Sequence, residues 1–461
     1  MLTYELKKAP GMPLYESLYR AIRADILSGR LAPGQKLPSK RTLCANLKVS
    51  KITVEGAYNQ LLSEGYIRSE EKVGYFVEQV ERPEQQQAVP IREEEKRNDD
   101  IDLTGYGPAR FPFSVWSKLQ REVMLDMGEQ LLSELHHPGS PPLRRAIAEH
   151  LGEFRGMQVD PENILIGAGT DFLYNLLVQL LGRNKIYAVE EPGYSKIRRI
   201  YAAAGARCVS AYMDHQGVRA DSLADAQVLH LSPSHHFPSG LVTPLSRRLE
   251  LLAWARETDR WIIEDDYDSE FRFAAHPLPT MQSLDREGKV IYMNTFSKTL
   301  APSIRISYMV LPGKLMERFR RELGFYSCTV PSFEQYTLER FLSRGYFEKH
   351  INRMRKFYKG CRNRVLEVLQ SCDGAARLTI QEENAGLHFV VRVDTVLTDE
   401  ELVRHCEKAG IRVRSLGSYY HDSVPETAQK CLLVNYSGLG DEQTEVLQQR
   451  IKTLFSPALR G

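Results

Sequence analysis

A single lysine, Lys298, lies in the segment NTFSKTLAPSIRISY, beside small hydroxyl residues and ahead of an arginine. The hydroxyl residues are Thr295 and Ser297, and Arg305 follows the lysine by seven positions. An amine in this setting can form a Schiff base with an aldehyde, while hydroxyls and a guanidinium can hydrogen-bond a phosphate. Pyridoxal 5'-phosphate carries both groups, so the segment predicts a site for it. A solvated surface lysine in a polar loop is the alternative.

A second anion-binding element is predicted where the strand NILI meets the helix DFLYNLLVQLL. Ala168, Gly169 and Thr170 form the turn between them, and such a turn offers backbone amides and a helix dipole to a phosphate. Further along, EEPGY places Tyr194 at a strand end. Its ring suits stacking on a heteroaromatic cofactor, although a packed loop tyrosine is the alternative.

Four carboxylates gather at the end of another strand, in IIEDDYD at residues 262–268. One of them could neutralise a protonated pyridine nitrogen, which makes a pyridoxal ring an electron sink, and Tyr267 could hydrogen-bond the ring's phenolic oxygen. The rival interpretation is a magnesium site, because clustered carboxylates also suit a hard cation. The chain has no phosphate loop of the Gly-x-x-x-x-Gly-Lys-Ser/Thr type, which counts against nucleotide hydrolysis.

The loop SPSHHFPSG carries two adjacent histidines, His235 and His236. A metal site is conceivable there, but adjacent histidines without partners at ligand spacing are more often polar loop residues. We therefore predict no metal site. The seven cysteines are widely scattered and never form a C-x-x-C pair, which argues against a disulfide framework or a thiolate zinc site.

Apolar strands alternate with amphipathic helices from residue 101 onward, as in an α/β domain with a largely parallel sheet. The strand C-termini are where such folds bind ligands. After about residue 316 helices dominate and are followed by a smaller α+β subdomain. The predicted strands are NILIGAG, KIYAVEE, QVLHLSP, WIIEDDY, VIYMNTF and ISYMVLP, then RLTIQEE, GLHFVVRV, IRVRSL and CLLVNYS.

Residues 12–78 predict three helices and a β-hairpin. Apolar residues recur every four positions from Leu14 to Ile26, and Gly29 is placed to end that helix. Ser39 and Ser50 can each cap a further helix, which makes a helix-turn-helix. The segments YIRS and GYFVEQ then form the hairpin, or wing.

Positive charge is concentrated in this N-terminal segment. Residues 1–80 hold 12 Lys and Arg against 8 Asp and Glu, whereas the whole chain of 461 residues carries a net charge of only +2. Basic and hydroxyl side chains at the starts of the second and third helices can reach phosphates and base edges. A scaffold with merely solvated lysines is the alternative.

Residues 79–101 are rich in Gln and charge and almost free of apolar residues, so we expect a flexible linker. An acidic helix is the alternative, which Pro83 and Pro90 disfavour. No apolar run approaches the ~18 residues of a spanning helix, and the first residues lack the apolar core of a signal peptide. We therefore expect a cytosolic protein with no membrane partner.

The motifs ILSGRLAPGQKLPS and L-x-x-EG-x-I show that residues 13–77 resemble the winged helix-turn-helix of the GntR family of bacterial repressors. The resemblance implies binding to double-stranded DNA through a domain of residues 1–78. It places the DNA contacts on Lys40, Arg41, Ser50, Lys51 and Thr53, with Lys72 and Gly74 of the wing near the minor groove.

The segments EEPGY, SPSHHFPSG, EDDYDSEFRF and TFSKTLAPSIRISY resemble, in this order, the cofactor-binding motifs of fold-type I aminotransferases. With the N-terminal match, nearly the whole chain resembles MocR/GabR-type regulators, in which a GntR-type domain is fused to an aminotransferase-like effector domain. Here that domain would span residues 102–461, with its large part ending near residue 315 and a small subdomain from about residue 316.

The resemblance assigns roles residue by residue. Lys298 would hold pyridoxal 5'-phosphate as a lysine aldimine, Asp265 the pyridine nitrogen and Tyr267 the phenolic oxygen. Tyr194 would stack on the ring and His235 would lie near it. The phosphate would be held by Arg305, Thr295, Ser297 and the turn of Ala168, Gly169 and Thr170.

Two departures from the family pattern bear on function. The C-terminal strand that carries a carboxylate-binding arginine in aminotransferases has Leu433 at the matching place in CLLVNYSGL, and LHHPGSPPLRRAI lacks the tyrosine that relatives carry there. Lys196, Arg412 or Arg414 could substitute, but Lys does not reproduce bidentate Arg geometry. Efficient transamination is therefore not expected.

Two functions follow as expectations. The first is a transcriptional regulator that senses pyridoxal 5'-phosphate or an amino compound through Lys298 and works as a head-to-tail homodimer, as the family resemblance implies. The second is an active aminotransferase with an accessory N-terminal domain.

Overall fold

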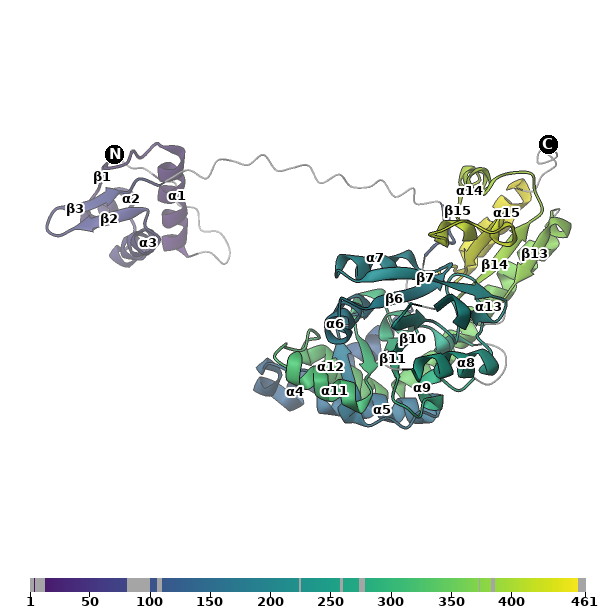
Figure 1. Ribbon diagram of the computed structural model, residues 1–461. Helices are drawn as coiled ribbons and strands as arrows, with labels where there is room; N and C mark the ends of the chain where they lie inside the picture. Colours follow the sequence, from purple (N-terminus) through teal and green to yellow (C-terminus); the bar gives the residue numbers. More distant parts are fainter. Residues whose placement is uncertain are drawn as a thin grey trace. The chain divides into compact units, whose positions relative to one another are not determined.

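The computed structural model describes residues 4, 13–80, 100–105, 110–223, 225–257, 260–272, 278–372, 374–382 and 386–454. The chain divides into an N-terminal unit, Met1–Lys96, and a C-terminal unit, Arg97–Gly461 (Figure 1). Most of the predicted linker, residues 81–99, lies outside the described residues. Its last residue, Ile101, begins a strand of the C-terminal unit, β4 (Ile101–Asp102).

The N-terminal unit is the predicted winged helix-turn-helix. Gly29 ends the first helix in the left-handed conformation at φ 81°, and the Ser39 and Ser50 side chains accept hydrogen bonds from the amides of Thr42 and Thr53 and so cap the next two helices. The sequence did not reveal the short first strand, which pairs with the wing to give the sheet order β1-β3-β2. The elements are α1 (Leu14–Ser28), β1 (Lys36–Leu37), α2 (Lys40–Leu47), α3 (Lys51–Ser63), β2 (Ile67–Glu70) and β3 (Gly74–Val77).

The C-terminal unit is built on an eight-stranded sheet of order β5-β12-β11-β10-β9-β6-β7-β8. The pairs β10–β11, β9–β10, β6–β9 and β6–β7 are parallel, while β12 is antiparallel to both of its neighbours. The prediction of a mostly parallel large sheet is confirmed, although β7 was not among the predicted strands. The strands are β5 (Ile164–Gly167), β6 (Ile186–Glu191), β7 (Arg207–Asp214), β8 (Gly217–Val218), β9 (Val228–Leu231), β10 (Trp261–Asp265), β11 (Val290–Thr295) and β12 (Ser307–Val310).

Helices cover both faces of this sheet because its central strands are apolar on both sides (Figure 1). Ile263 faces one helical layer and the adjacent Ile262 faces the other. One layer contains α6 (Thr170–Leu181), α7 (Ser195–Ala203) and α11 (Gly313–Glu322), and the other contains α5 (Pro141–Arg155), α8 (Leu245–Ala255), α9 (Met281–Leu284) and α12 (Ser332–Ser343). Outside them, α4 (Phe113–Met127) packs on α12.

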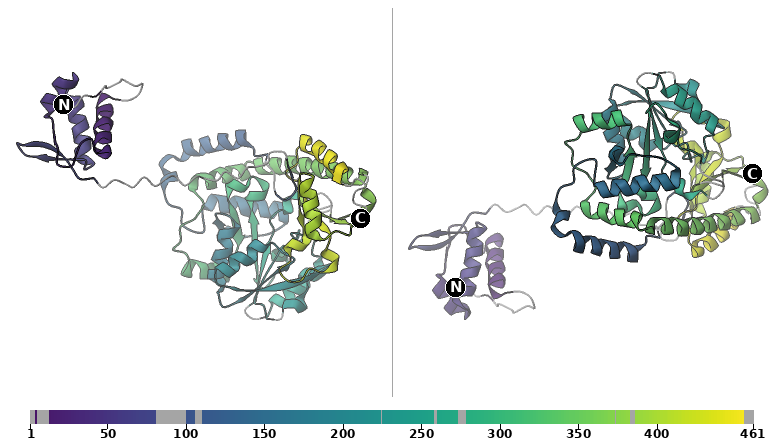
Figure 2. Two further views of the ribbon diagram at one scale, coloured as in Figure 1. Left: turned by 90° about the horizontal axis from the view of Figure 1, so that it is seen from above. Right: turned by 90° about the horizontal axis from the view of Figure 1, so that it is seen from below.

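The 26-residue helix α13 (Tyr346–Ser371) joins the large part to a smaller α+β part (Figure 2). The smaller part has the antiparallel order β13-β14-β17-β16, and β15 pairs with β4. Helices α11 and α12 pack with the large part, and α13 packs with α12 and with α15 of the small part. The limit near residue 316 stays a prediction. Its elements are β13 (Leu378–Gln381), β14 (His388–Val393), α14 (Asp399–Lys408), β15 (Ile411–Arg412), β16 (Arg414–Ser415), β17 (Cys431–Asn435) and α15 (Asp441–Leu454).

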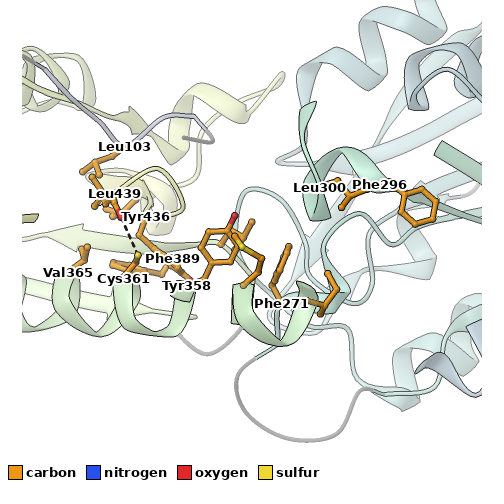
Figure 3. Close-up of a cluster of buried hydrophobic side chains, with 14 of the residues drawn as sticks. Leu103, Phe271, Phe296, Leu300, Tyr358, Cys361, Val365, Phe389, Tyr436 and Leu439 are labelled. Carbon is orange, nitrogen blue, oxygen red and sulfur yellow. Dashed lines mark hydrogen bonds between the residues drawn. The ribbon is translucent and has the colours of Figure 1, made fainter. Parts of the chain in front are cut away.

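One hydrophobic cluster runs through both parts of the C-terminal unit (Figure 3). It includes Phe296 and Leu300 from the large part and Tyr358 and Phe389 from α13 and the small sheet. Phe296 and Leu300 therefore belong to the same packed cluster as side chains of the small sheet. Within the described ranges, no helix is both long and apolar enough to cross a bilayer.

Candidate cofactor site and nucleic-acid interface

Lys298 lies on the short helix α10 (Phe296–Thr299), directly after β11. The buried side chains of Phe296 and Leu300 anchor the helix on either side of the lysine. Burial lowers the pKa of Lys298 to about 7, although the nearby carboxylates of Asp268 and Asp265 favour the charged form. The lowered pKa favours the neutral amine of Lys298 more than in an exposed lysine.

Asp265 is buried at the end of β10, where one side chain from another element hydrogen-bonds a carboxylate oxygen and a second lies near it. The Tyr174 hydroxyl donates to its Oδ2 across 2.5 Å, and His230 Nε2 lies 3.5 Å from the same atom. Burial and the Asp265 charge raise the pKa of Tyr174 well above its ordinary value, so the phenol keeps the proton that it donates. Asp265 Oδ1 has no hydrogen-bond partner among the described residues, which leaves it available to a ligand.

The structure brings Tyr267 and His235 together beside Asp268. The Tyr267 hydroxyl lies 3.3 Å from His235 Nδ1, which in turn lies 2.8 Å from Asp268 Oδ2. Asp268 also acts on the pKa of Lys298, so this carboxylate borders both the histidine and the lysine. In the described part of the chain, no group of three or more His, Cys, Asp or Glu side chains could hold a metal ion.

The predicted phosphate turn is formed around Gly169, which precedes α6 with a φ of 89°. A Cβ atom at this position would collide with the guanidinium of Arg305. Arg305 Nη2 is 3.3 Å from Asp171 Oδ2, while the Ala168 amide donates to Thr329 Oγ1 across 3.0 Å. A cavity of about 760 Å³, lined in part by Ala168 and Arg305, opens beside the turn.

The two predicted hydroxyls differ in what they contact. Thr295 Oγ1 accepts hydrogen bonds from the Ser297 amide at 3.1 Å and the Ser307 hydroxyl at 2.8 Å, and donates to the Ile306 carbonyl at 3.4 Å. It therefore caps α10 and ties it to the chain that follows. Ser297 Oγ is buried and has no partner among the described residues, so it is better placed to bind a ligand.

Tyr194 lies at the start of α7 with 48% of its surface exposed. Its ring meets Phe237 edge to face, with 5.8 Å between the centroids. Stacking of this ring on a cofactor stays a prediction.

The position of the family's carboxylate-binding arginine is apolar here, and the three candidate substitutes contact other groups of the chain. Leu433 is buried on β17 in an apolar cluster with Val390 and Leu416. Lys196 Nζ is 2.6 Å from Asp171 Oδ2, and Arg412 Nη2 is 3.0 Å from Asp102 Oδ2. Arg414 pairs in register with Leu433 and hydrogen-bonds Tyr419.

Three residues at this site were missed from the sequence: Tyr174, His230 and Thr329. Tyr174 follows Thr170 by four positions, so both lie on one face of α6, and this spacing could have indicated it. Neither His230, inside the apolar run VLHL, nor Thr329, far along the chain, carries a local signal.

In the N-terminal unit, the predicted DNA contacts cluster at the starts of α2 and α3 and in the wing. Neither helix has an acidic residue in its first turn, although a carboxylate there would interact favourably with the helix dipole. Lys40 lies over the Tyr75 ring, and Ser50 and Thr53 share a 2.8 Å hydroxyl hydrogen bond. The exposed members are Arg41, Ser50, Lys51 and Lys72; Lys40, Thr53 and Gly74 are partly buried.

Comparison with known proteins agrees with both units. Residues 14–77 match the bacterial regulatory proteins of the gntR family, and residues 101–451 match aminotransferase class I and II. The HTH-type transcriptional regulator YdeL of Bacillus subtilis (strain 168) is 36% identical over 98% of this chain and 98% of its own length. The probable rhizopine catabolism regulatory protein MocR of Rhizobium meliloti is 33% identical over 98% of this chain and 95% of its own length.

Among solved structures, the kynurenine aminotransferase of Pyrococcus horikoshii, in a complex with PMP, shares the fold at a TM-score of 0.66 and 26% identity. That match covers 78% of this chain and 92% of the aminotransferase. The N-terminal and C-terminal matches together show that the chain belongs to the MocR-type HTH transcriptional regulators, which join a GntR-family helix-turn-helix to an aminotransferase class I and II domain.

Proposed function

We propose that this regulator binds pyridoxal 5'-phosphate at Lys298 and senses the cofactor itself, or an amino compound that competes with Lys298 for it. The position of Lys298 on α10, directly after β11 and near Asp265 and Asp268, carries the proposal, and the desolvation that lowers the pKa of this lysine to about 7 supports it. A neutral amine is the nucleophilic form of lysine, and the lowered pKa gives Lys298 more of this form at pH 7 than an exposed lysine has.

The residues around Lys298 fit the cofactor. When bound, pyridoxal 5'-phosphate supplies an aldehyde that reacts with amines and a pyridine ring that withdraws electrons. Asp265 would neutralise the protonated ring nitrogen through its open Oδ1, while Tyr174 fixes the other oxygen. Tyr267 would hydrogen-bond the phenolic oxygen, with His235 behind it.

The phosphate would lie at the turn before α6. Gly169 leaves room there for Arg305, and Ser297 Oγ is buried without a described partner. Thr295 would act indirectly, by capping α10 and holding Ser297 in place. The rest of the proposed cofactor set is Ala168 and Thr170 of the turn, and Tyr194 against the ring.

The N-terminal unit would bind double-stranded DNA through its basic helix starts and wing. Both helix starts present cations or hydroxyls and have no acidic residue in the first turn, which suits a polyanion, and Glu55 one turn further into α3 pairs with Lys40 and Lys51. We assign the contacts to Lys40, Arg41, Ser50, Lys51, Thr53, Lys72 and Gly74. The proposed domain limits are residues 1–78 and 102–461, with the linker running from residue 79 to the start of β4 at Ile101.

The active form would be a head-to-tail homodimer. Apolar side chains are largely exposed along and after α4, at Phe113, Leu125 and Leu132. Side chains of this kind would lose their exposure to water if α4 packed against a second copy.

The switch would be a population shift between two arrangements of the small part. An amino compound that takes the cofactor from Lys298 changes the forces on α10, and Phe296 and Leu300 connect α10 to the cluster shared with α13 and the small sheet. A ligand favouring one arrangement would thereby change the spacing of the two DNA-binding units in the dimer.

The experiment compares DNA footprints of the wild type and Lys298→Ala, with and without pyridoxal 5'-phosphate and a panel of amino compounds. The footprint of the wild type should change with a ligand and that of the variant should not; a ligand response that survives in Lys298→Ala would refute sensing through this residue. Single-turnover spectroscopy of the same panel tests the aminotransferase alternative, and fast multiple turnover with a keto acid would favour it.

A further inference from the structure

Ile52 is 80% exposed at the start of α3, the highest exposure of any large hydrophobic side chain in the described part of the chain. It follows the helix cap Ser50 and lies between Lys51 and Thr53, two proposed DNA contacts. The sequence reasoning passed over it because it is neither charged nor a hydrogen-bonding residue.

The helix geometry keeps Ile52 out of the unit's own core. The buried stripe of α3 consists of Val54, Ala57, Tyr58 and Leu61, and Ile52 projects roughly 160° around the helix axis from Val54. A β-branched side chain in an exposed helical turn also loses rotamer freedom without gaining packing. Nothing in the folding of this unit accounts for an isoleucine here.

The side chains around Ile52 indicate which kind of partner could bury it. Lys51 is exposed on one side, Thr53 is half-buried on the other, and Asn59, on the same face about two turns later, is exposed and polar. Glu55, one turn after Ile52, lies 3.7 Å from Lys51 Nζ and 3.9 Å from Lys40 Nζ, so its charge is balanced by these two lysines. A lone apolar group among polar and charged side chains is too small for the core of a protein interface. It matches a partner that is anionic overall but presents single methyl groups.

Duplex DNA has this chemistry in its major groove, where thymine alone presents a methyl group, at C5. We propose that Ile52 reads a thymine C5-methyl group in the major groove, and that it sets sequence preference at that base pair while the neighbouring lysine contacts phosphate. The inference rests on the proposed DNA binding and adds a specificity-determining residue to it.

The test uses the full-length protein and DNA selected by it from a randomised duplex library. Each thymine in the selected sequence is replaced in turn by deoxyuridine, which removes only the methyl group. For the wild type, one thymine per half-site should show an increase in Kd of about fourfold, the value expected for loss of one buried methyl-sized group.

Ile52→Ala should bind the thymine and deoxyuridine duplexes equally at that position, as should Ile52→Ser. Val73→Ala, which removes an exposed apolar side chain from the wing turn, should keep the fourfold difference. Because Ile52 is exposed, its variants should unfold at the wild-type temperature, and that measurement confirms that they are folded.

The outcomes separate this inference from the proposed function. If the wild type selects no sequence and binds no DNA, DNA binding itself fails. If it selects a sequence but no deoxyuridine substitution weakens binding, or if Ile52→Ala retains the same sensitivity, then DNA binding stands and Ile52 does not read thymine. Equal weakening of Ile52→Ala on every duplex would also overturn the inference, since it would show contact without base discrimination.

Discussion

The guanidinium of Arg305 occupies the space into which a side chain at position 169 would project, so the glycine and the arginine form one structural unit. The two residues come from segments far apart in the chain, the turn before α6 and the residue after the short 3-10 turn Pro302–Ile304. Gly169 therefore serves two needs, a φ of 89° and room for Arg305 at the proposed phosphate site.

Gly169→Ala should weaken pyridoxal 5'-phosphate binding by at least about tenfold, because the added methyl group displaces a charge-assisted phosphate ligand. Fluorescence titration of the apoprotein measures this. Gly205→Ala is the matched control, since its φ is 87° but the nearest atom to a built Cβ is 3.8 Å away. Gly169→Ala should also lose stability, on the order of 1–3 kcal/mol, because φ 89° with ψ 162° is a backbone conformation nearly confined to glycine. Equal cofactor affinity in Gly169→Ala and Gly205→Ala would contradict the proposal that Gly169 makes room for Arg305 at the phosphate.

Lys298→Ala should abolish the visible absorption band that pyridoxal 5'-phosphate gives with the wild type, because the variant has no amine at α10 to react with the aldehyde. Lys314→Ala, which removes an exposed lysine from α11, should keep the band. Absorption spectra after removal of unbound cofactor decide the matter, and a full band in Lys298→Ala would mean that another lysine reacts.

The rate of cofactor capture should depend on pH with a midpoint near 7. Only the neutral amine reacts, so the rate should rise about tenfold per pH unit below the pKa of Lys298 and level off above it. Stopped-flow absorbance against pH measures it. A midpoint near 10 would show that the lysine is not buried in solution.

Replacing Asp268 tests whether its negative charge raises the pKa of Lys298. Asp268 favours the ammonium form and so raises the pKa of Lys298 against the effect of burial. Asp268→Asn should therefore move the midpoint of the pH profile to lower pH, whereas Asp221→Asn, at an exposed turn, should leave it unchanged.

Lys51→Ala should weaken DNA binding by a similar factor on specific and random duplexes, because a phosphate contact carries no sequence information. The slope of log K against log salt should fall in magnitude by about one. Fluorescence anisotropy at several salt concentrations tests this, with Lys118→Ala on α4 as the control. An unchanged slope would show that Lys51 does not contact a phosphate.

Local sequence determined much of the fold. Ser39 and Ser50 fix the starts of α2 and α3 because a cap needs only a side-chain oxygen and an amide three residues away. The two-residue strand β1 had no such signal, since it exists only through pairing with β3. β7 was missed because it is only partly buried and carries Arg207, Ser210 and Asp214 among its apolar residues.

For the site, the sequence by itself determined the order of the motifs and singled out Lys298, because an amine, hydroxyls and an arginine within one segment are visible without a fold. Only the tertiary structure decided that Tyr174 hydrogen-bonds Asp265 with His230 nearby, and that Thr295 caps α10 while Ser297 Oγ has no described partner. It also decided the pKa of Lys298, because desolvation depends on everything packed around the amine. The chain order supplies reactive groups, and their burial and mutual distances, which folding alone creates, determine how they react.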